Sequence, residues 1–188
     1  MKRIADLLFE ARMLKEVPRS GLHFLGVGRE SVAEHVYSVT FIAFVMMQLH
    51  PELDGRKLLC LCLVHDLPEA RTGDLNSVHK SYVQADEDRA VADLTQGLAF
   101  GDRIRELIAE YRAGRSLEAR LARDADQLAL VLELKDLDDI GHGPPQTWLP
   151  HVVGRLQTDT GKALADAIMS TRRDAWWWQA AVSREKSA

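Results

Sequence analysis

The sequence predicts an all-α protein, a single bundle of helices without a β-sheet. Apolar residues recur at the three- and four-residue spacing of an amphipathic helix almost throughout, and no convincing stretch alternates apolar with polar residues. Prolines and glycines gather in short segments that separate the helical patterns. None of these segments is long enough to be a linker. We therefore expect one domain over residues 1–182, followed by a frayed polar tail over 183–188.

The expected helices follow from these patterns and their end signals. An apolar stripe beginning at Ile4 predicts the first helix, which ends before Pro18–Gly21. Ser31 with Glu34 three residues later predicts a capping box at the start of the second helix. The helices are expected to cover approximately residues 2–16, 32–49, 55–66, 84–99, 101–112, 117–139 and 161–181. Glycines, prolines and Asn76 predict loops near 68–76 and 141–145.

Composition excludes several classes of function. The net charge of −4 and the pI of about 6.0 argue against a protein that coats a nucleic acid polymer. The longest apolar run, Val39–Leu49, is too short to span a bilayer, so no membrane partner is expected. The two cysteines, Cys60 and Cys62, match neither a redox motif nor a zinc-finger spacing. With no signal-peptide pattern at the N-terminus, we expect a cytoplasmic protein.

The pair His65-Asp66 is the most informative feature of the chain. It ends the apolar run Leu61–Val64. Adjacent helical residues point about 100° apart, so both side chains can reach one cation beside the helix end. A carboxylate in such a buried setting needs a cation or several hydrogen-bond donors. The alternative is that Asp66 only ends its helix and faces water.

Two further ligand-type side chains lie within apolar helical patterns. His35 sits one turn into the second helix; alone, it would be a core histidine bonded to a carbonyl. Asp126 is flanked by apolar residues in the long helix. Asp124, two positions away, is expected to point elsewhere and to pair with Arg123 or Arg120.

Together these side chains could surround one divalent ion and leave positions for water and a substrate oxygen, which is typical of catalytic rather than structural sites. The candidate ligands are His35, His65, Asp66 and Asp126. The mixed nitrogen and oxygen donors disfavour a thiolate zinc site, but they do not distinguish Mn, Co, Fe, Zn, Mg and Cu.

These residues resemble the H…HD…D signature of the HD-domain phosphohydrolases. The sequence around them is similar to the 5'-deoxynucleotidase branch of that superfamily, and the resemblance extends over roughly residues 5–170. The similar stretches are VPRSG (17–21), ESVAEH (30–35), VHDLPEA (64–70), GDL (73–75), SLEAR (116–120) and DADQL (124–128).

The resemblance implies an all-helical HD fold, usually a homodimer, with one divalent ion. It implies hydrolysis of deoxyribonucleoside 5'-monophosphates to deoxynucleoside and phosphate. It places the four candidate ligands on the metal. It also makes Glu69 and Asp74 the two further acidic site residues, near the attacking water and the leaving oxygen.

The loop after the first helix departs from some bacterial relatives, which carry an Arg-Trp pair near the substrate sugar. Here Arg19 is followed by Ser20 and Gly21. This leaves the choice between 2'-deoxy and ribo sugars open. Arg19 is a candidate contact to the substrate phosphate or sugar. Further candidate phosphate partners are Arg12, Arg71 and Lys80.

Two other functions remain open. The chain could be an HD phosphohydrolase that acts on a dNTP, a cyclic dinucleotide or ppGpp. It could also be a non-catalytic, metal-containing module that binds nucleotides.

The tryptophans lie outside this constellation. Three consecutive residues on a helix spread over most of its circumference, so at least one ring of Trp176–Trp178 must face away from its own core. This predicts a dimer interface or a groove filled by a neighbouring helix; the alternative is a C-terminal helix with two of the rings buried and one on the surface. Trp148 is expected to anchor a loop rather than to stack on a base.

Overall fold

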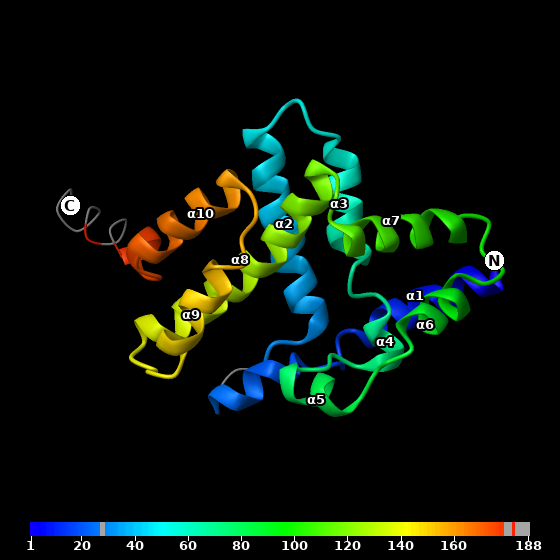
Figure 1. The fold of residues 1–188 in the computed structure, drawn as a ribbon, viewed down its shortest axis with the longest axis horizontal. Helices are drawn as coiled ribbons and strands as arrows, with labels where there is room; N and C mark the ends of the chain where they lie inside the picture. The colour runs from blue at the N-terminus through cyan, green and yellow to red at the C-terminus, as the bar shows by residue number, and fades with distance from the viewer. Residues whose placement is uncertain (27–28, 179–181, 183–188) are drawn as a thin grey trace.

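The protein is all-helical. The structure, a computed structural model, describes residues 1–26, 29–178 and 182. Over these residues it contains no β-strand, only an isolated antiparallel bridge between Pro18 and Ser31, so the predicted fold class is confirmed. The helices are α1 (Lys2–Met13), the 3-10 helix η1 (Ser20–Leu25), α2 (Val32–Leu49), α3 (Gly55–Val64), α4 (Glu69–Thr72), α5 (Ser77–Tyr82), α6 (Glu87–Thr95), α7 (Gly101–Ala113), α8 (Leu117–Asp139), α9 (Pro145–Val153) and α10 (Asp159–Ser170) (Figure 1).

The central core is formed by α2, α3 and α8, which pack against one another in the middle of the molecule (Figure 1). Met46 of α2, Leu61 of α3 and Leu128 of α8 are all completely buried. Burial of an aliphatic side chain of this size contributes about 1.5–3 kcal/mol. Many such contacts hold the three helices in fixed relative positions, which matters because all three carry candidate site residues.

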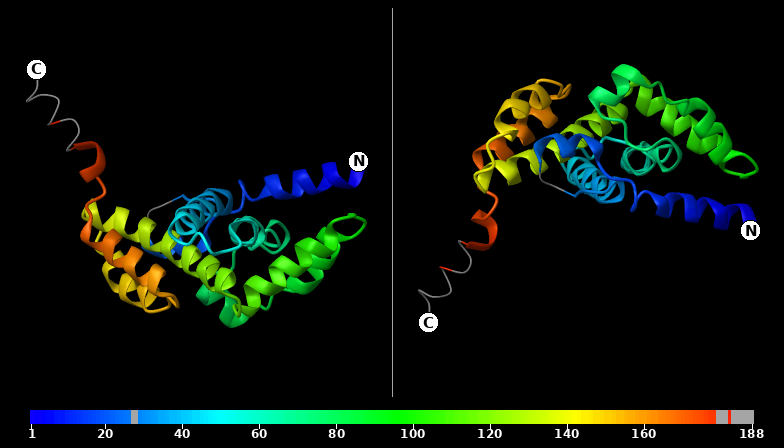
Figure 2. Two further views of the ribbon diagram at one scale, coloured as in Figure 1. Left: turned by 90° about the horizontal axis from the view of Figure 1, so that it is seen from above. Right: turned by 90° about the horizontal axis from the view of Figure 1, so that it is seen from below.

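Two smaller apolar clusters attach the remaining elements to this core. The first cluster joins α1 and α4 to α6 and α7, and includes Leu7 and Leu94. The second joins η1 to the C-terminal half of α8 and to α9, through Leu22, Leu134 and Leu149. Seen from above and below, the α6–α7 pair and the α9–α10 pair lie at opposite ends of the molecule, with α2 and α3 between them (Figure 2).

Helix α2 begins where the sequence predicts. The Ser31 hydroxyl accepts the Glu34 N–H, and the Glu34 carboxylate accepts the Ser31 N–H at 2.7 Å, which confirms the capping box. The helix is longer than the apolar run Val39–Leu49, and by length and composition alone it could cross a membrane. In this fold it packs against α3 and α8, and its inner face carries the buried His35.

Several predicted element boundaries are wrong. Helix α9 starts at Pro145, inside the segment expected as a loop. Proline is tolerated at this position because the N–H group that it lacks would have no partner within the first helical turn. The short helix α4 lies inside the predicted 68–76 loop, and α5, which was not predicted, follows it where the Asn76 side chain accepts two backbone N–H groups. The last regular helix ends at Ser170, and a separate helical segment covers 175–178. Residues 179–181 and the expected tail over 183–188 lie outside the described residues.

Asp124 holds the start of α10 against α8. Its predicted pairing with Arg123 or Arg120 is wrong, because Asp124 is completely buried. Its carboxylate accepts the N–H groups of Gln157 and Thr158, both at 2.8 Å, and the Thr158 hydroxyl at 2.6 Å. Arg123 instead donates to a backbone carbonyl of α7.

Candidate active site and metal centre

The candidate ligands come from the three helices of the central core. His35 lies on the first turns of α2 and is fully buried. His65 caps the C-terminus of α3, and Asp66 follows it in the turn that leads to α4. Asp126 lies near the middle of α8. Because the core fixes these helices, side chains from distant parts of the chain meet at one point.

The four side chains converge within a few ångströms. His35 Nε2 lies 2.9 Å from Asp126 Oδ1 and 3.8 Å from Asp66 Oδ2. His65 Nε2 lies 3.2 Å from the same Asp66 oxygen. Ligand atoms of His35, His65 and Asp126 all lie within 4.8 Å of one another. This spacing allows all four side chains to face one central ion.

The donor atoms themselves fit a cation. His65 Nδ1 lies 2.7 Å from the backbone oxygen of Cys62 and donates to it, so Nε2 is the nitrogen that points to the cluster and would bind a cation. His65 Nε2 and Asp66 Oδ2 are buried and have no hydrogen-bond partner among the described residues. Unpartnered buried polar atoms are costly, and a metal ion between them would remove that cost.

The charges at the cluster also favour a cation. Burial alone would raise the pKa of Asp126, but the hydrogen bond from His35 and the charges of both histidines and Arg19 lower it well below its ordinary value. Burial alone would lower the pKa of His65, but Asp66 and Asp126 raise it to about 9. Without an ion, protons on histidine balance the carboxylates. A metal ion would take the place of those protons, since ligating histidines must be neutral.

Glu69 stands beside the ligands at the start of α4. The helix of α3 does not continue to it; a turn over residues 65–68 intervenes. Burial, followed by the negative charges of Asp66 and Asp74, raises the pKa of Glu69 to about 9. Its Oε2 is buried and lacks a hydrogen-bond partner in the part of the chain that is described.

Arg19 and Asp74 connect two loops next to the ligands. Arg19 Nη1 lies 3.8 Å from Asp66 Oδ2 and 3.9 Å from Asp74 Oδ2. Asp74 Oδ2 accepts the Ser20 N–H at 2.8 Å, and the Ser20 hydroxyl donates to the Asp74 carbonyl at 2.6 Å. Gly73 has φ 72°, a conformation that favours glycine, and this turn brings Asp74 back toward Ser20.

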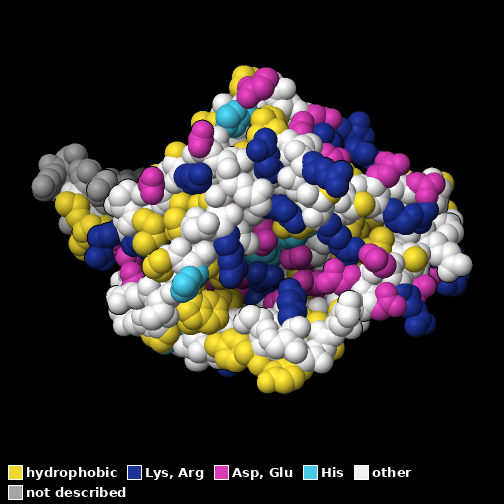
Figure 3. Space-filling view, viewed as in Figure 1, with side chains coloured by type: hydrophobic (Ala, Val, Ile, Leu, Met, Phe, Trp, Pro, Cys, Tyr) yellow, Lys and Arg dark blue, Asp and Glu magenta, His cyan; other side chains and the backbone are white. Residues whose placement is uncertain are grey.

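A pocket of about 470 Å³ opens over these groups, within the size range of small-molecule sites. Arg19, Asp66, Glu69, Asp74 and Asp126 all line it. Figure 3 shows this face of the molecule: acidic side chains and a histidine lie in a hollow near the centre, surrounded by lysine and arginine side chains, with apolar side chains along one edge.

Known proteins have similar sequences and a similar fold. A family model described as HD domain matches residues 11–169. The chain belongs to the HD-domain family.

Several known proteins are similar to this HD domain over most of its length, in sequence or in structure. It is 32% identical to the human protein named 5'-deoxynucleotidase HDDC2 over 150 residues, which is 77% of this chain and 68% of the relative. It is 25% identical to 5'-deoxynucleotidase hdd1 of Schizosaccharomyces pombe over 177 residues, 87% of each chain. Among solved structures, a conserved hypothetical protein from Pyrococcus furiosus superimposes with a TM-score of 0.75 at 27% identity, covering 89% of this chain and 99% of that one.

The HD domain contains site residues that the sequence did not indicate. The Tyr111 hydroxyl donates to Asp126 Oδ2 at 3.1 Å, and the Gln127 amide lies 3.2 Å from the same oxygen. Gln127 could have been suspected from its position next to Asp126. No sequence signal identifies Tyr111, because only the packing of α7 on α8 brings it to the site.

The candidate phosphate partners separate into two groups. Lys80 lines the pocket together with Arg19. Arg71 lies elsewhere, 2.6 Å from a Glu10 carboxylate oxygen. Arg12 is paired with Glu16 at 3.8 Å on the outer surface of α1. Of the four candidate phosphate partners, Lys80 and Arg19 are therefore the two that are placed to meet a ligand in the pocket.

Proposed function

We infer that this HD domain is a metal-dependent phosphohydrolase that converts deoxyribonucleoside 5'-monophosphates to deoxynucleosides and phosphate. The observation that carries this inference is the convergence of two histidines and two aspartates at a pocket large enough for a small ligand. Two of their donor atoms, His65 Nε2 and Asp66 Oδ2, are buried without a hydrogen-bond partner in the described chain. The names of the human and fission yeast relatives, both 5'-deoxynucleotidases, support the substrate class.

We propose that one divalent ion is held by the four convergent ligands: His35, His65, Asp66 and Asp126. When bound, such an ion supplies positive charge to phosphate oxygens and acidifies water. The donor set admits several first-row metals, and metal analysis of the purified protein identifies the native one.

Glu69 is proposed to orient the attacking water and to accept its proton. It lies beside Asp66, and its unpartnered Oε2 faces no competing donor in the described chain. A general base must be ionised to act. Neighbouring carboxylates contribute to the raised pKa of Glu69, so positive charge at the ligand set favours its ionised form.

Arg19 and Asp74 are proposed to act on the substrate. Arg19 remains protonated and offers a planar set of N–H donors suited to phosphate. Asp74 is proposed to protonate the leaving deoxynucleoside oxygen. Because Asp74 Oδ2 accepts the Ser20 N–H, the other carboxyl oxygen is the one available to carry that proton.

A phosphate-release screen tests this function. The purified protein is stripped of metal, reloaded with Mn, Co, Mg or Zn, and offered dNMPs, NMPs, dNTPs, cyclic dinucleotides and ppGpp. We expect release from dNMPs by the metal-loaded protein only. Preferred turnover of dNTPs, cyclic dinucleotides or ppGpp would indicate another HD phosphohydrolase. No turnover of any substrate would indicate a binding module.

We also propose that the protein is a cytoplasmic homodimer. Cys60 and Cys62 are both free thiols, which suits a reducing compartment. On the side of the molecule away from the pocket, Tyr37, Phe41 and Phe44 form an exposed stripe on α2, which we call the aromatic stripe. Three neighbouring aromatic side chains that are all exposed favour an interface with another protein. The partner proposed here is a second copy of this chain.

A further inference from the structure

The pocket has two chemically different ends. Asp126 and the other acidic groups of the candidate site mark one end, in the hollow of Figure 3, and apolar side chains lie along one edge of that hollow. Two basic residues, Lys80 and Arg155, line the pocket as well. The apolar lining residues are Leu22, Phe24, Leu130, Trp148 and Val152. Helix α8 connects the ends, because Asp126 and Leu130 are one turn apart, or about 6 Å along the helix axis. A ligand with a charged group at Asp126 therefore has room for an apolar or aromatic group a short distance away.

Trp148 is the largest side chain of the apolar end, and it is held in place by packing. It is partly buried against the cluster that joins η1, α8 and α9, and it also lines the pocket. Val152 and Arg155 follow it at positions i+4 and i+7, so one face of α9 and of the residues just beyond it borders the pocket. Packing on the core fixes the indole ring, while the pocket leaves part of it accessible.

Phe24 stands on another element at the same pocket. Its neighbours Leu22 and Leu25 are buried between α8 and α9, and the Leu25 carbonyl lies 2.7 Å from His142 Nε2. Phe24 itself is 54% exposed. An exposed aromatic ring on an anchored helix is typical of a surface that meets a ligand.

We propose that Trp148, with Phe24 at the rim, stacks on the nucleobase of the substrate and is the main determinant of base binding. This proposal rests on the proposed function, since the phosphate must lie at the ligand end. Base–aromatic stacking tolerates every base because each has a π-face. We therefore expect all four dNMPs to be accepted, with purines bound more tightly than pyrimidines.

Two substitutions distinguish what the aromatic ring of Trp148 contributes to binding from what its apolar bulk contributes. W148F keeps an aromatic ring, whereas W148L keeps an apolar side chain without one. Their kinetics are measured with dAMP and with deoxyribose 5-phosphate, which lacks the base. W148L is expected to raise KM for dAMP roughly ten-fold, the effect of losing one stacked base, with a much smaller change for deoxyribose 5-phosphate. W148F should retain most of the affinity for dAMP. Y82L, at an exposed aromatic residue outside the pocket lining, is the control.

Equal losses for both substrates in W148L, or no loss for dAMP, would overturn the proposal.

A direct binding measurement tests the base site independently of the proposed reaction. Deoxyadenosine should quench tryptophan fluorescence of the wild-type protein, and W148F should lose most of that quenching. Quenching that persists in W148F counts against Trp148. If the wild-type protein hydrolyses neither substrate but shows Trp148-dependent quenching, the proposed reaction fails and the base site stands.

Discussion

At the scale of single residues, hydrogen bonds decide which atoms face the metal centre. The backbone oxygen of Cys62 accepts a hydrogen bond from Nδ1 of His65 and leaves Nε2 toward the cluster. Tyr111 and Gln127 both approach Oδ2 of Asp126 and leave Oδ1 beside His35. Such partners around the ligands orient them and commonly change metal affinity about 10–100-fold when removed.

Asp126→Asn should weaken metal binding and slow hydrolysis together. Asparagine keeps the shape and can still accept from Tyr111, but it removes the negative charge that faces His35. Metal affinity is expected to fall by more than roughly ten-fold, measured by metal analysis after dialysis, and phosphate release should fall with it. D166N, at an exposed aspartate of α10, is the matched control. Retention of full metal content in D126N would remove Asp126 from the ligand set.

Glu69→Gln should slow the reaction without releasing the metal. Glutamine has the same size as glutamate but cannot accept a proton from water. We expect kcat to fall by roughly 100-fold or more, the usual contribution of a general base, while metal content equals that of the wild-type protein. If the variant also loses its metal, Glu69 is a ligand and its proposed role is wrong.

Glu30→Gln should stabilise the protein in a pH-dependent way. Burial raises the pKa of Glu30 to about 7, although Arg19 opposes this shift. A raised carboxyl pKa means that wild-type stability falls as pH rises from about 4.5 to 7. Because the carboxyl is partly solvated, the effect is on the order of 1 kcal/mol, so E30Q should raise Tm by roughly 2–4 °C at pH 8 and by much less at pH 5.

Glu34 provides a control of opposite sign for this pH experiment. The hydrogen bonds from Ser31 lower the pKa of Glu34, so its ionised form stabilises the fold above about pH 4.5. E34Q should therefore lower Tm at both pH 5 and pH 8. Equal increases in Tm for E30Q at the two pH values would show that Glu30 does not titrate as described.

At the scale of helices, Asp124 determines where α10 begins. Asp124→Ala leaves the N–H group of Thr158 buried, and that of Gln157 partly buried, without their acceptor. Hydrogen bonds to a charged group contribute about 1.5–3 kcal/mol each, so we expect a loss of about 3 kcal/mol or more, or a Tm lower by roughly 6–12 °C. Thermal unfolding measures this, with D166A on the exposed face of α10 as control. Equal Tm values for the two variants would exclude this role.

The sequence predicted helices well where local signals agree and poorly where tertiary contacts decide. The capping box at Ser31 and the long α8 follow from local sequence. Pro144 and Pro145 instead suggested a loop, yet they begin α9, whose burial of Leu149 stabilises it. The role of Asp124 could not be predicted either, since its partners lie 33 and 34 residues away in the sequence.

At the scale of the whole molecule, distant sequence motifs converge because they lie on the buried faces of core helices. The unusual position of Asp126 in an apolar pattern was a valid signal, since a buried carboxylate needs a partner. Tyr111 gave no comparable signal, because an aromatic residue in a helical pattern is equally consistent with ordinary core packing. Trp148 was expected to anchor a loop, but it lies in α9. The position of Tyr111 beside Asp126 and that of Trp148 at the pocket depend on how α7 and α9 pack on α8.

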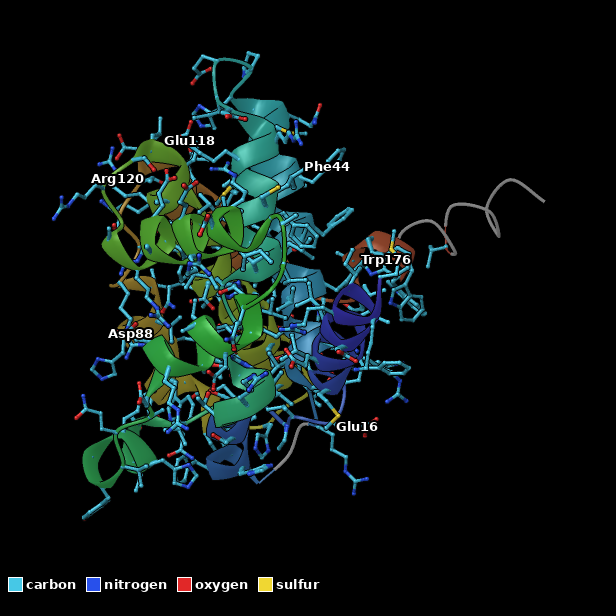
Figure 4. All side chains as sticks on the ribbon, turned by 90° about the vertical axis from the view of Figure 1, so that its right-hand side faces the viewer. Glu16, Phe44, Asp88, Glu118, Arg120 and Trp176 are labelled. Atoms are coloured by element: carbon cyan, nitrogen blue, oxygen red, sulfur yellow. The ribbon has the colours of Figure 1, made fainter. Side chains whose placement is uncertain are left out.

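The molecule also has two opposite faces. The pocket opens on the face shown in Figure 3, whereas Phe44 and Trp176 project on the other side, along which α1 also runs (Figure 4). Trp176, Trp177 and Trp178 are 81%, 48% and 56% exposed, so the alternative in which two of these rings are buried is wrong. Leu8 and Phe9 of α1 are exposed as well. So much exposed apolar surface on a single chain favours an interface with another protein.

Phe41→Glu should therefore convert the proposed homodimer to a monomer. Phe41 lies between Tyr37 and Phe44 in the aromatic stripe, with ring centroids 6.3 and 6.2 Å away, and a buried unpaired carboxylate at the centre of an interface is strongly unfavourable. Light scattering should give twice the chain mass of 21.1 kDa for the wild-type protein and 21.1 kDa for F41E. Y82E, which places the same charge at an exposed aromatic residue of α5, should remain dimeric. A monomeric wild-type protein, or a dimeric F41E, would exclude the aromatic stripe as the interface.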